Sequence, residues 1–183
     1  MNKIKLFRSI KFKGKVLIVR VIFLTAIARF AMLKLPFKKL KKYMGQINEE
    51  SSFKIDGNFG KDFAEDFGEN EKGNCTKSGK GNQRDLNYVI NDLKRFRWAI
   101  QAVSKRTPWE SKCLVQALTA QYLSNKKGIT TTLYLGVKRD SDNNLIAHSW
   151  IRCGDFYITG GNGAGYAITA KFTKDGNKIN PVG

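Results

Sequence analysis

One cysteine and one histidine in this sequence have the types and spacing of a nucleophile and its base. Cys113 stands in TPWESKCLVQAL, residues 107–118, where an apolar repeat of three and four residues begins. A thiol in the first turn of a helix feels the positive end of the helix dipole and ionises more readily. His148, the single histidine of the chain, follows 35 residues later. An imidazole can deprotonate a thiol and then protonate a leaving amine, which is the chemistry of a cysteine hydrolase.

Two helices are expected to position the thiol. In residues 87–106 the apolar side chains are mostly three or four positions apart, which predicts a core-facing helix that ends before Pro108. A second helix is predicted within residues 110–128, with Ser111 or Thr107 as its cap. Cys113 would then lie in its first turn.

Alternating apolar residues predict an antiparallel sheet after these helices. The predicted strands are residues 131–139, 146–153 and 155–159. A tight hairpin at Gly154 and Asp155 would pair Ile151 with Ile158. Helices followed by such a sheet indicate an α+β domain, which we assign to residues 86–183.

Most of the net charge lies in residues 1–45. The chain of 183 residues has a formal charge of +18, and this segment holds thirteen lysines and arginines and no acid. The remainder is nearly balanced, so any attraction to nucleic acid or anionic lipid would belong to this segment rather than to the whole protein. We expect no nucleic-acid partner. Residues 16–33 are apolar over about the length of a membrane span, but Arg20 and Arg29 disfavour a span. The segment is predicted to be a basic amphipathic helix that packs on the domain or a partner, with a membrane-surface helix and a span as alternatives.

Residues 46–85 are rich in glycine, asparagine, serine and charge, and they predict a polar connector. Its Cys75 is expected to be an incidental thiol. Cys75, Cys113 and Cys153 cannot all pair and show no short metal-ligand spacing. This indicates a reduced, cytoplasmic protein without a metal or cofactor.

The runs PWESKCLVQALTAQYLSNKKGITTTLYLGV and AHSWIRCGDFYITGG resemble the transglutaminase-like leader protease of lasso-peptide biosynthesis, the B protein in its split form. The likeness covers about residues 86–172. It implies a papain-like or transglutaminase-like fold, with Cys113 and His148 as catalytic residues. It also implies ATP-independent removal of the leader peptide from a ribosomally made precursor before macrolactam ring closure.

The resemblance also implies partners. These are the precursor peptide, a small leader-recognition protein and an asparagine-synthetase-like cyclase. The basic charge and apolar run of residues 1–45 separately predict a peripheral membrane contact. Two alternatives stay open at this point. One is another transglutaminase-like thiol acyltransferase or amidase, and the other is a non-enzymatic, basic, membrane-associated module.

The third catalytic residue is where the sequence departs from the family's pattern. Relatives resemble a Cys-His-Asp triad whose aspartate comes about a dozen residues after the histidine, a position that is Gly160 here. Asn162 is the preferred candidate to orient the imidazole, because the third member sets its tautomer and direction. Thr159, Asp155, a backbone carbonyl and a water molecule are the alternatives.

Overall fold

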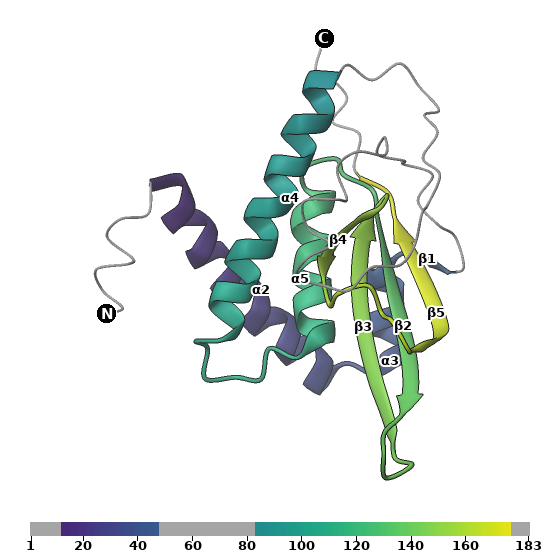
Figure 1. The fold of residues 1–183 in the computed structure, drawn as a ribbon. Helices are drawn as coiled ribbons and strands as arrows, with labels where there is room; N and C mark the ends of the chain where they lie inside the picture. The colour runs from purple at the N-terminus through teal and green to yellow at the C-terminus, as the bar shows by residue number, and fades with distance from the viewer. Residues whose placement is uncertain (1–11, 48–82, 177–183) are drawn as a thin grey trace.

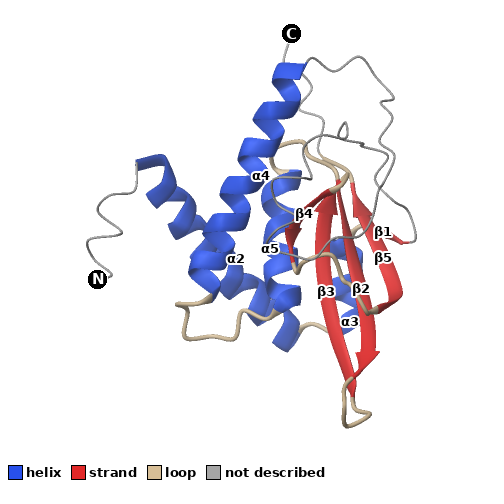
Figure 2. Ribbon diagram, in the orientation of Figure 1, coloured by secondary structure: helices blue, strands red, loops and turns tan. Residues whose placement is uncertain are grey.

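The computed structural model describes residues 12–47 and 83–176 of the chain, which fold into helices on one side of a single antiparallel sheet (Figure 1, Figure 2). The α+β class predicted from the sequence is confirmed. The helices are α2 (Phe12–Lys34), α3 (Phe37–Met44), α4 (Gln83–Ser104) and α5 (Cys113–Asn125). The strands are β1 (Gln46–Ile47), β2 (Thr131–Arg139), β3 (Leu145–Cys153), β4 (Phe156–Thr159) and β5 (Ala167–Lys174).

The sheet has the strand order β1-β5-β2-β3-β4, and every neighbouring pair is antiparallel. β2, β3 and β4 follow the predicted strands, whereas β1 and β5 were not predicted. A bulge between Leu135 and Gly136 in the β2–β5 pairing explains why β5 has a weak signal. Because a bulge reverses the alternation of faces, Phe172 is buried while Ile168 is exposed.

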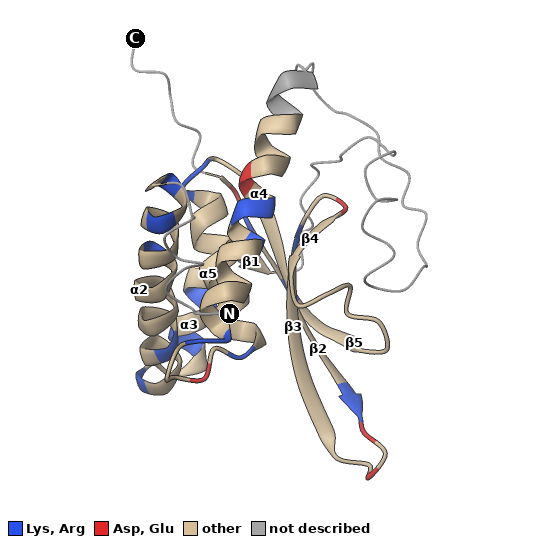
Figure 3. Ribbon diagram, turned by 60° about the vertical axis from the view of Figure 1, so that its left-hand side comes forward, with Lys and Arg blue, Asp and Glu red and all other residues tan. Residues whose placement is uncertain are grey.

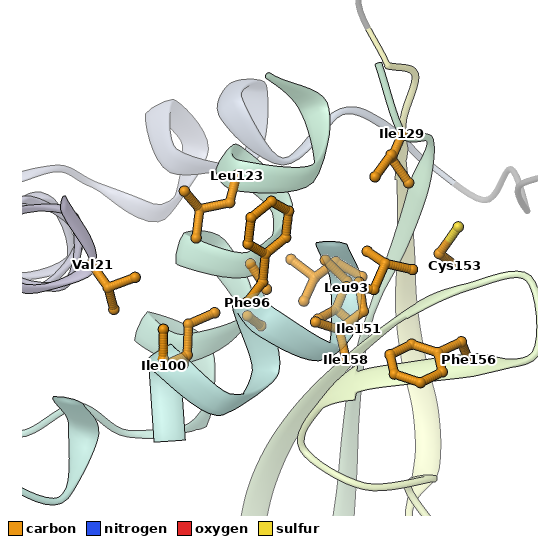
Figure 4. Close-up of a cluster of buried hydrophobic side chains, with 14 of the residues drawn as sticks. Val21, Leu93, Phe96, Ile100, Leu123, Ile129, Ile151, Cys153, Phe156 and Ile158 are labelled. Atoms are coloured by element: carbon orange, nitrogen blue, oxygen red, sulfur yellow. The ribbon is translucent and has the colours of Figure 1, made fainter. Parts of the chain in front are cut away.

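The hydrophobic core lies between α4, α5 and the sheet (Figure 4). α4 buries Leu93, Phe96 and Ile100 because these residues recur at steps of three and four along one face. β3 contributes Ile151 to the same cluster, and α2 contributes Val21. The core thus fixes α5 against the strand that carries His148.

The described part of the N-terminal segment, from residue 12 onward, is part of this fold. Val21 and Thr25 of α2 are fully buried, and Leu40 and Met44 of α3 are buried too, so the segment packs on the domain. β1 follows at once and pairs with β5, so the predicted connector begins with two residues of strand. Residues 48–82, which include most of that connector and Cys75, lie outside the described residues.

The amphipathic pattern predicted for this segment is wrong for α2. Its outer side chains include Phe23, Ile27 and Phe30, each more than 60% exposed, so α2 is apolar on both faces. α3 is the amphipathic helix, because its lysines lie on the side away from Leu40 and Met44.

Candidate active site

Cys113 is the first residue of α5. The residue before it, Lys112, occupies the N-cap position and makes no capping side-chain hydrogen bond. The predicted caps, Thr107 and Ser111, instead share a hydrogen bond of 3.1 Å between their hydroxyl groups. Because the first N–H groups of a helix lack intrahelical acceptors, the backbone N–H of Cys113 is available to an anion beside the thiol. This is the position required of an oxyanion donor.

His148 is held by the backbone of the segment that follows β4. Its Nε2 lies 2.7 Å from the carbonyl oxygen of Gly160. A carbonyl only accepts hydrogen bonds, so Nε2 carries the proton in the neutral ring and Nδ1 keeps its lone pair. The geometry therefore presents Nδ1 as the atom that can take a proton.

Aromatic rings fix the plane of this imidazole. The His148 ring lies 6.0 Å from the Trp150 ring and 4.9 Å from the Tyr166 ring, measured between centroids. Trp150 in turn stacks on Tyr134 at 5.5 Å, with the two planes 3° apart. The indole also lies over Gly136 and Gly163, where an added Cβ would come closer than 3.0 Å to it.

A shallow pocket of about 230 Å³ opens beside His148. Residues 160–164 and Tyr166 form the rest of its lining. The glycine-rich run thus forms a wall next to the imidazole, with Gly160, Gly161 and Gly163 at positive φ. Cys113 is not among the lining residues.

Cys113 and His148 lie at about the same level along the sheet. α5 runs antiparallel to β2 after a short connection, and Cys113 is 12 residues, or about 18 Å, from the end of its helix. Gly136 is five residues, or about 17 Å, from the start of β2, and it pairs directly with His148. The N-terminus of α5 therefore lies beside the part of the sheet that contains His148.

The two side chains are not in contact, however. Within the described residues, no hydrogen bond joins Cys113 to His148. Alternation along β3 places His148 with Trp150 on one face, while Ser149 and Ile151 point to the face that carries the core under α5. In this structure the thiol and the imidazole are therefore not hydrogen-bonded for direct proton transfer.

Comparison with known proteins identifies the family. The sequence matches the transglutaminase-like superfamily over residues 73–173. This chain belongs to the transglutaminase-like superfamily. No curated protein and no solved structure matches it.

The partner of the imidazole in this transglutaminase-like domain is a backbone carbonyl. The predicted Asn162 lines the same pocket, but its Oδ1 accepts a hydrogen bond from the backbone N–H of Ala164 at 3.0 Å. Thr159 is buried, and its hydroxyl has no hydrogen-bond partner within the described residues. Asp155 lies exposed in the turn between β3 and β4. A catalytic role for Asn162 remains a prediction.

The predicted hairpin register is wrong by one residue. Cys153 pairs with Phe156 as expected, but Ile151 pairs with Thr159 rather than with Ile158. β4 therefore has one extra residue at this point, and Ile158 is buried in the core. The chain then turns away at Gly160, with its carbonyl directed at His148.

The loop that precedes Cys113 is held by α2, a feature that sequence reasoning missed. The indole N–H of Trp109 donates to Thr25 Oγ1 at 3.3 Å, and Arg29 Nη2 lies 3.1 Å from Glu110 Oε2. Lys112, with a smaller effect from Arg29, holds the pKa of the Glu110 carboxyl below its usual value. No short-range pattern could have revealed contacts across more than eighty residues.

The other described thiol, Cys153, is fully buried. Burial raises its pKa to about 12, so it stays protonated at neutral pH. It is therefore unsuited to nucleophilic attack, and Cys113 is the accessible thiol of the described residues.

Proposed function

We propose that this protein is a cysteine hydrolase in which Cys113 is the nucleophile and His148 the general base. The observation that carries the proposal is the hydrogen bond from His148 Nε2 to the Gly160 carbonyl, which leaves Nδ1 free to accept a proton. Membership of a transglutaminase-like superfamily and the position of Cys113 at a helix N-terminus support the same assignment.

The reaction would follow the usual course of a thiol enzyme. The Cys113 thiol gives its proton to His148 Nδ1, and the thiolate attacks the peptide carbonyl to form a tetrahedral oxyanion. The backbone N–H of Cys113 donates to this oxyanion. The imidazolium then protonates the leaving amine, and a thioester remains. Water, deprotonated by His148, attacks the thioester, and the released acid and free thiol complete the cycle.

Substrate binding must bring the two catalytic groups together. Catalytic hydrogen bonds are often long in free enzymes and form only in the substrate complex. In this protein residues 160–164 line the pocket beside His148, so a peptide bound there would contact them. We therefore place the scissile bond between the N-terminus of α5 and residues 160–164.

The substrate in this proposal is the precursor of a lasso peptide, cleaved between leader and core before ring closure. A small leader-recognition protein would present the leader, and an asparagine-synthetase-like cyclase would consume the product. The resemblance of the Cys113 and His148 segments to split B proteins supports this choice, and the cytoplasm is where a reduced thiol would act.

Mass spectrometry of a precursor incubated with enzyme and recognition protein tests the proposal. Cys113→Ala and His148→Ala should each remain folded and lose cleavage by at least about 10²-fold, as expected for a lost acid–base group. Cys153→Ala is the matched control and should still cleave. Unchanged cleavage by either catalytic variant would refute the assignment, and transfer of the acyl group to an added amine instead of water would identify an acyltransferase.

A further inference from the structure

The outer face of α2 carries a continuous row of exposed apolar side chains. Each is between 47% and 78% exposed, and successive members are three or four residues apart, which aligns them on one side of the helix. We call this row the α2 stripe; its members are Phe12, Val16, Val19, Phe23, Ile27, Phe30 and Leu33. Contiguous exposed apolar surface of this kind marks an interaction site.

The charges around the stripe are of one sign. Lys13 and Arg20 lie exposed within it, and Lys34 with the lysines of α3 follows it. Residues 12–47 contain no aspartate or glutamate. Figure 3 accordingly shows basic residues along α2 and α3 at the outer edge of the molecule. Apolar surface bordered by cations is complementary to a bilayer with anionic headgroups.

We infer that the α2 stripe docks in the plane of an anionic lipid bilayer. α2 is long and apolar enough to span a membrane by length and composition alone, but its inner face is occupied. Val21 and Thr25 are buried against the domain, and Arg29 is paired with Glu110. A spanning helix would give up these contacts, whereas a helix lying on the surface keeps them. This inference does not depend on the chemistry at Cys113.

A second copy of the chain is a less suitable partner for the α2 stripe than an anionic bilayer. A two-fold interface places the same patch on both subunits, so Arg20 and the flanking lysines of one copy would share the interface with the same cations of the other. Such like charges repel, and no acidic side chain in residues 12–47 could offset the repulsion. Anionic lipid meets both requirements of the patch, because it offers acyl chains for the stripe and phosphate for the cations.

Co-sedimentation of the full chain with vesicles tests the inference. We expect binding to vesicles of phosphatidylglycerol and phosphatidylcholine at low salt, with at least tenfold weaker binding to phosphatidylcholine alone. The double variant Phe23→Ser/Ile27→Ser should weaken binding at least tenfold while circular dichroism stays unchanged. The matched control Leu145→Ser/Ile146→Ser alters two exposed apolar residues of β3 and should bind as the original does.

A wash at about 1 M salt, where the Debye length is about 3 Å, should weaken the binding because it screens the cations beside the stripe. Binding that does not change with salt would overturn the pairing of these cations with anionic headgroups. Failure to bind anionic vesicles, or equal weakening by the β3 control, would overturn the assignment of the stripe to lipid. That assignment would also be overturned if the original protein were a dimer that Phe23→Ser/Ile27→Ser converts to a monomer.

Discussion

Trp109 donates its indole N–H to the hydroxyl oxygen of Thr25, which lies 84 residues earlier in the chain. The same hydroxyl donates to the carbonyl of Ile22 at 2.9 Å, so Thr25 links the loop before Cys113 to the backbone of α2. The N-terminal helix therefore sets the position of the segment that leads into the nucleophile.

We expect Thr25→Val to lower kcat for leader cleavage about tenfold with little change in KM. The substitution removes the acceptor of the Trp109 indole, and small displacements of a catalytic group have large effects on rate. Thr25→Ser, which keeps the hydroxyl, should restore the rate. Kinetics of the two variants beside their melting temperatures would check this; equal losses in Thr25→Ser and Thr25→Val would contradict a role for the hydrogen bond.

Gly160 should not tolerate a side chain. A Cβ at this position would lie closer than 3.0 Å to the Ser149 carbonyl and to Trp150 Cα, and its φ of +82° is already unfavourable for alanine. Gly160→Ala should therefore lose more than about 2 kcal/mol of unfolding free energy in urea, together with its cleavage activity.

Gly161→Ala is the control for this prediction. Gly161 has a similar φ of +68° but open space around the added Cβ, so only about 1 kcal/mol of backbone strain is expected. Similar losses in both variants would show that the crowding at Gly160 is unimportant.

Asn162 offers a test of how the imidazole is oriented. Its Oδ1 accepts from the Ala164 N–H, and aspartate can make the same turn. If the Gly160 carbonyl orients His148, Asn162→Asp should retain cleavage within about threefold, while Asn162→Ala should lose about tenfold through the altered turn. If Asn162→Ala instead lost cleavage by an amount approaching the 10⁴-fold effect of a removed triad residue, Asn162 would be the third catalytic residue.

Cys153 should make the fold sensitive to alkaline pH. Because burial raises its pKa to about 12, the folded state binds the thiol proton more tightly than the unfolded state does. The resulting stability is complete below about pH 8.5, the usual thiol pKa, and is lost as pH rises toward 12. Urea unfolding should show the advantage of the original protein over Cys153→Ala shrinking by about 1.4 kcal/mol per pH unit in this window. A constant difference would contradict the prediction.

The elements around the candidate site follow from local patterns in the sequence. The strand predicted at residues 131–139 has the bounds of β2, because TTLYLGVKR alternates regularly where one face packs on the core. The second predicted helix begins at Cys113, close to the expected first turn. These features depend on neighbouring residues, and so the sequence alone predicts them.

Other features depend on tertiary packing. The extra residue in β4 shifts the register so that the Gly160 carbonyl lies within hydrogen-bond distance of the His148 ring. No residue pattern distinguishes this register from the one without a bulge. β5 was not predicted because a bulge in its pairing with β2 interrupts the alternation of its side chains. Which sheet face His148 occupies relative to α5 likewise follows from the assembled core and not from the spacing between Cys113 and His148.

The position of α2 at the start of the fold has a consequence during synthesis. Its packing partners α4 and α5 come later in the chain, and Asn125 at the end of α5 is added 91 residues after Lys34. At translation rates of about 5–20 residues per second, α2 precedes them by roughly 5–18 s. During that interval the face of α2 that will later pack on the core is exposed to solvent, as the α2 stripe is. A nascent chain thus exposes both apolar faces of α2, and any factor that captures such helices at the ribosome has several seconds in which to compete with folding.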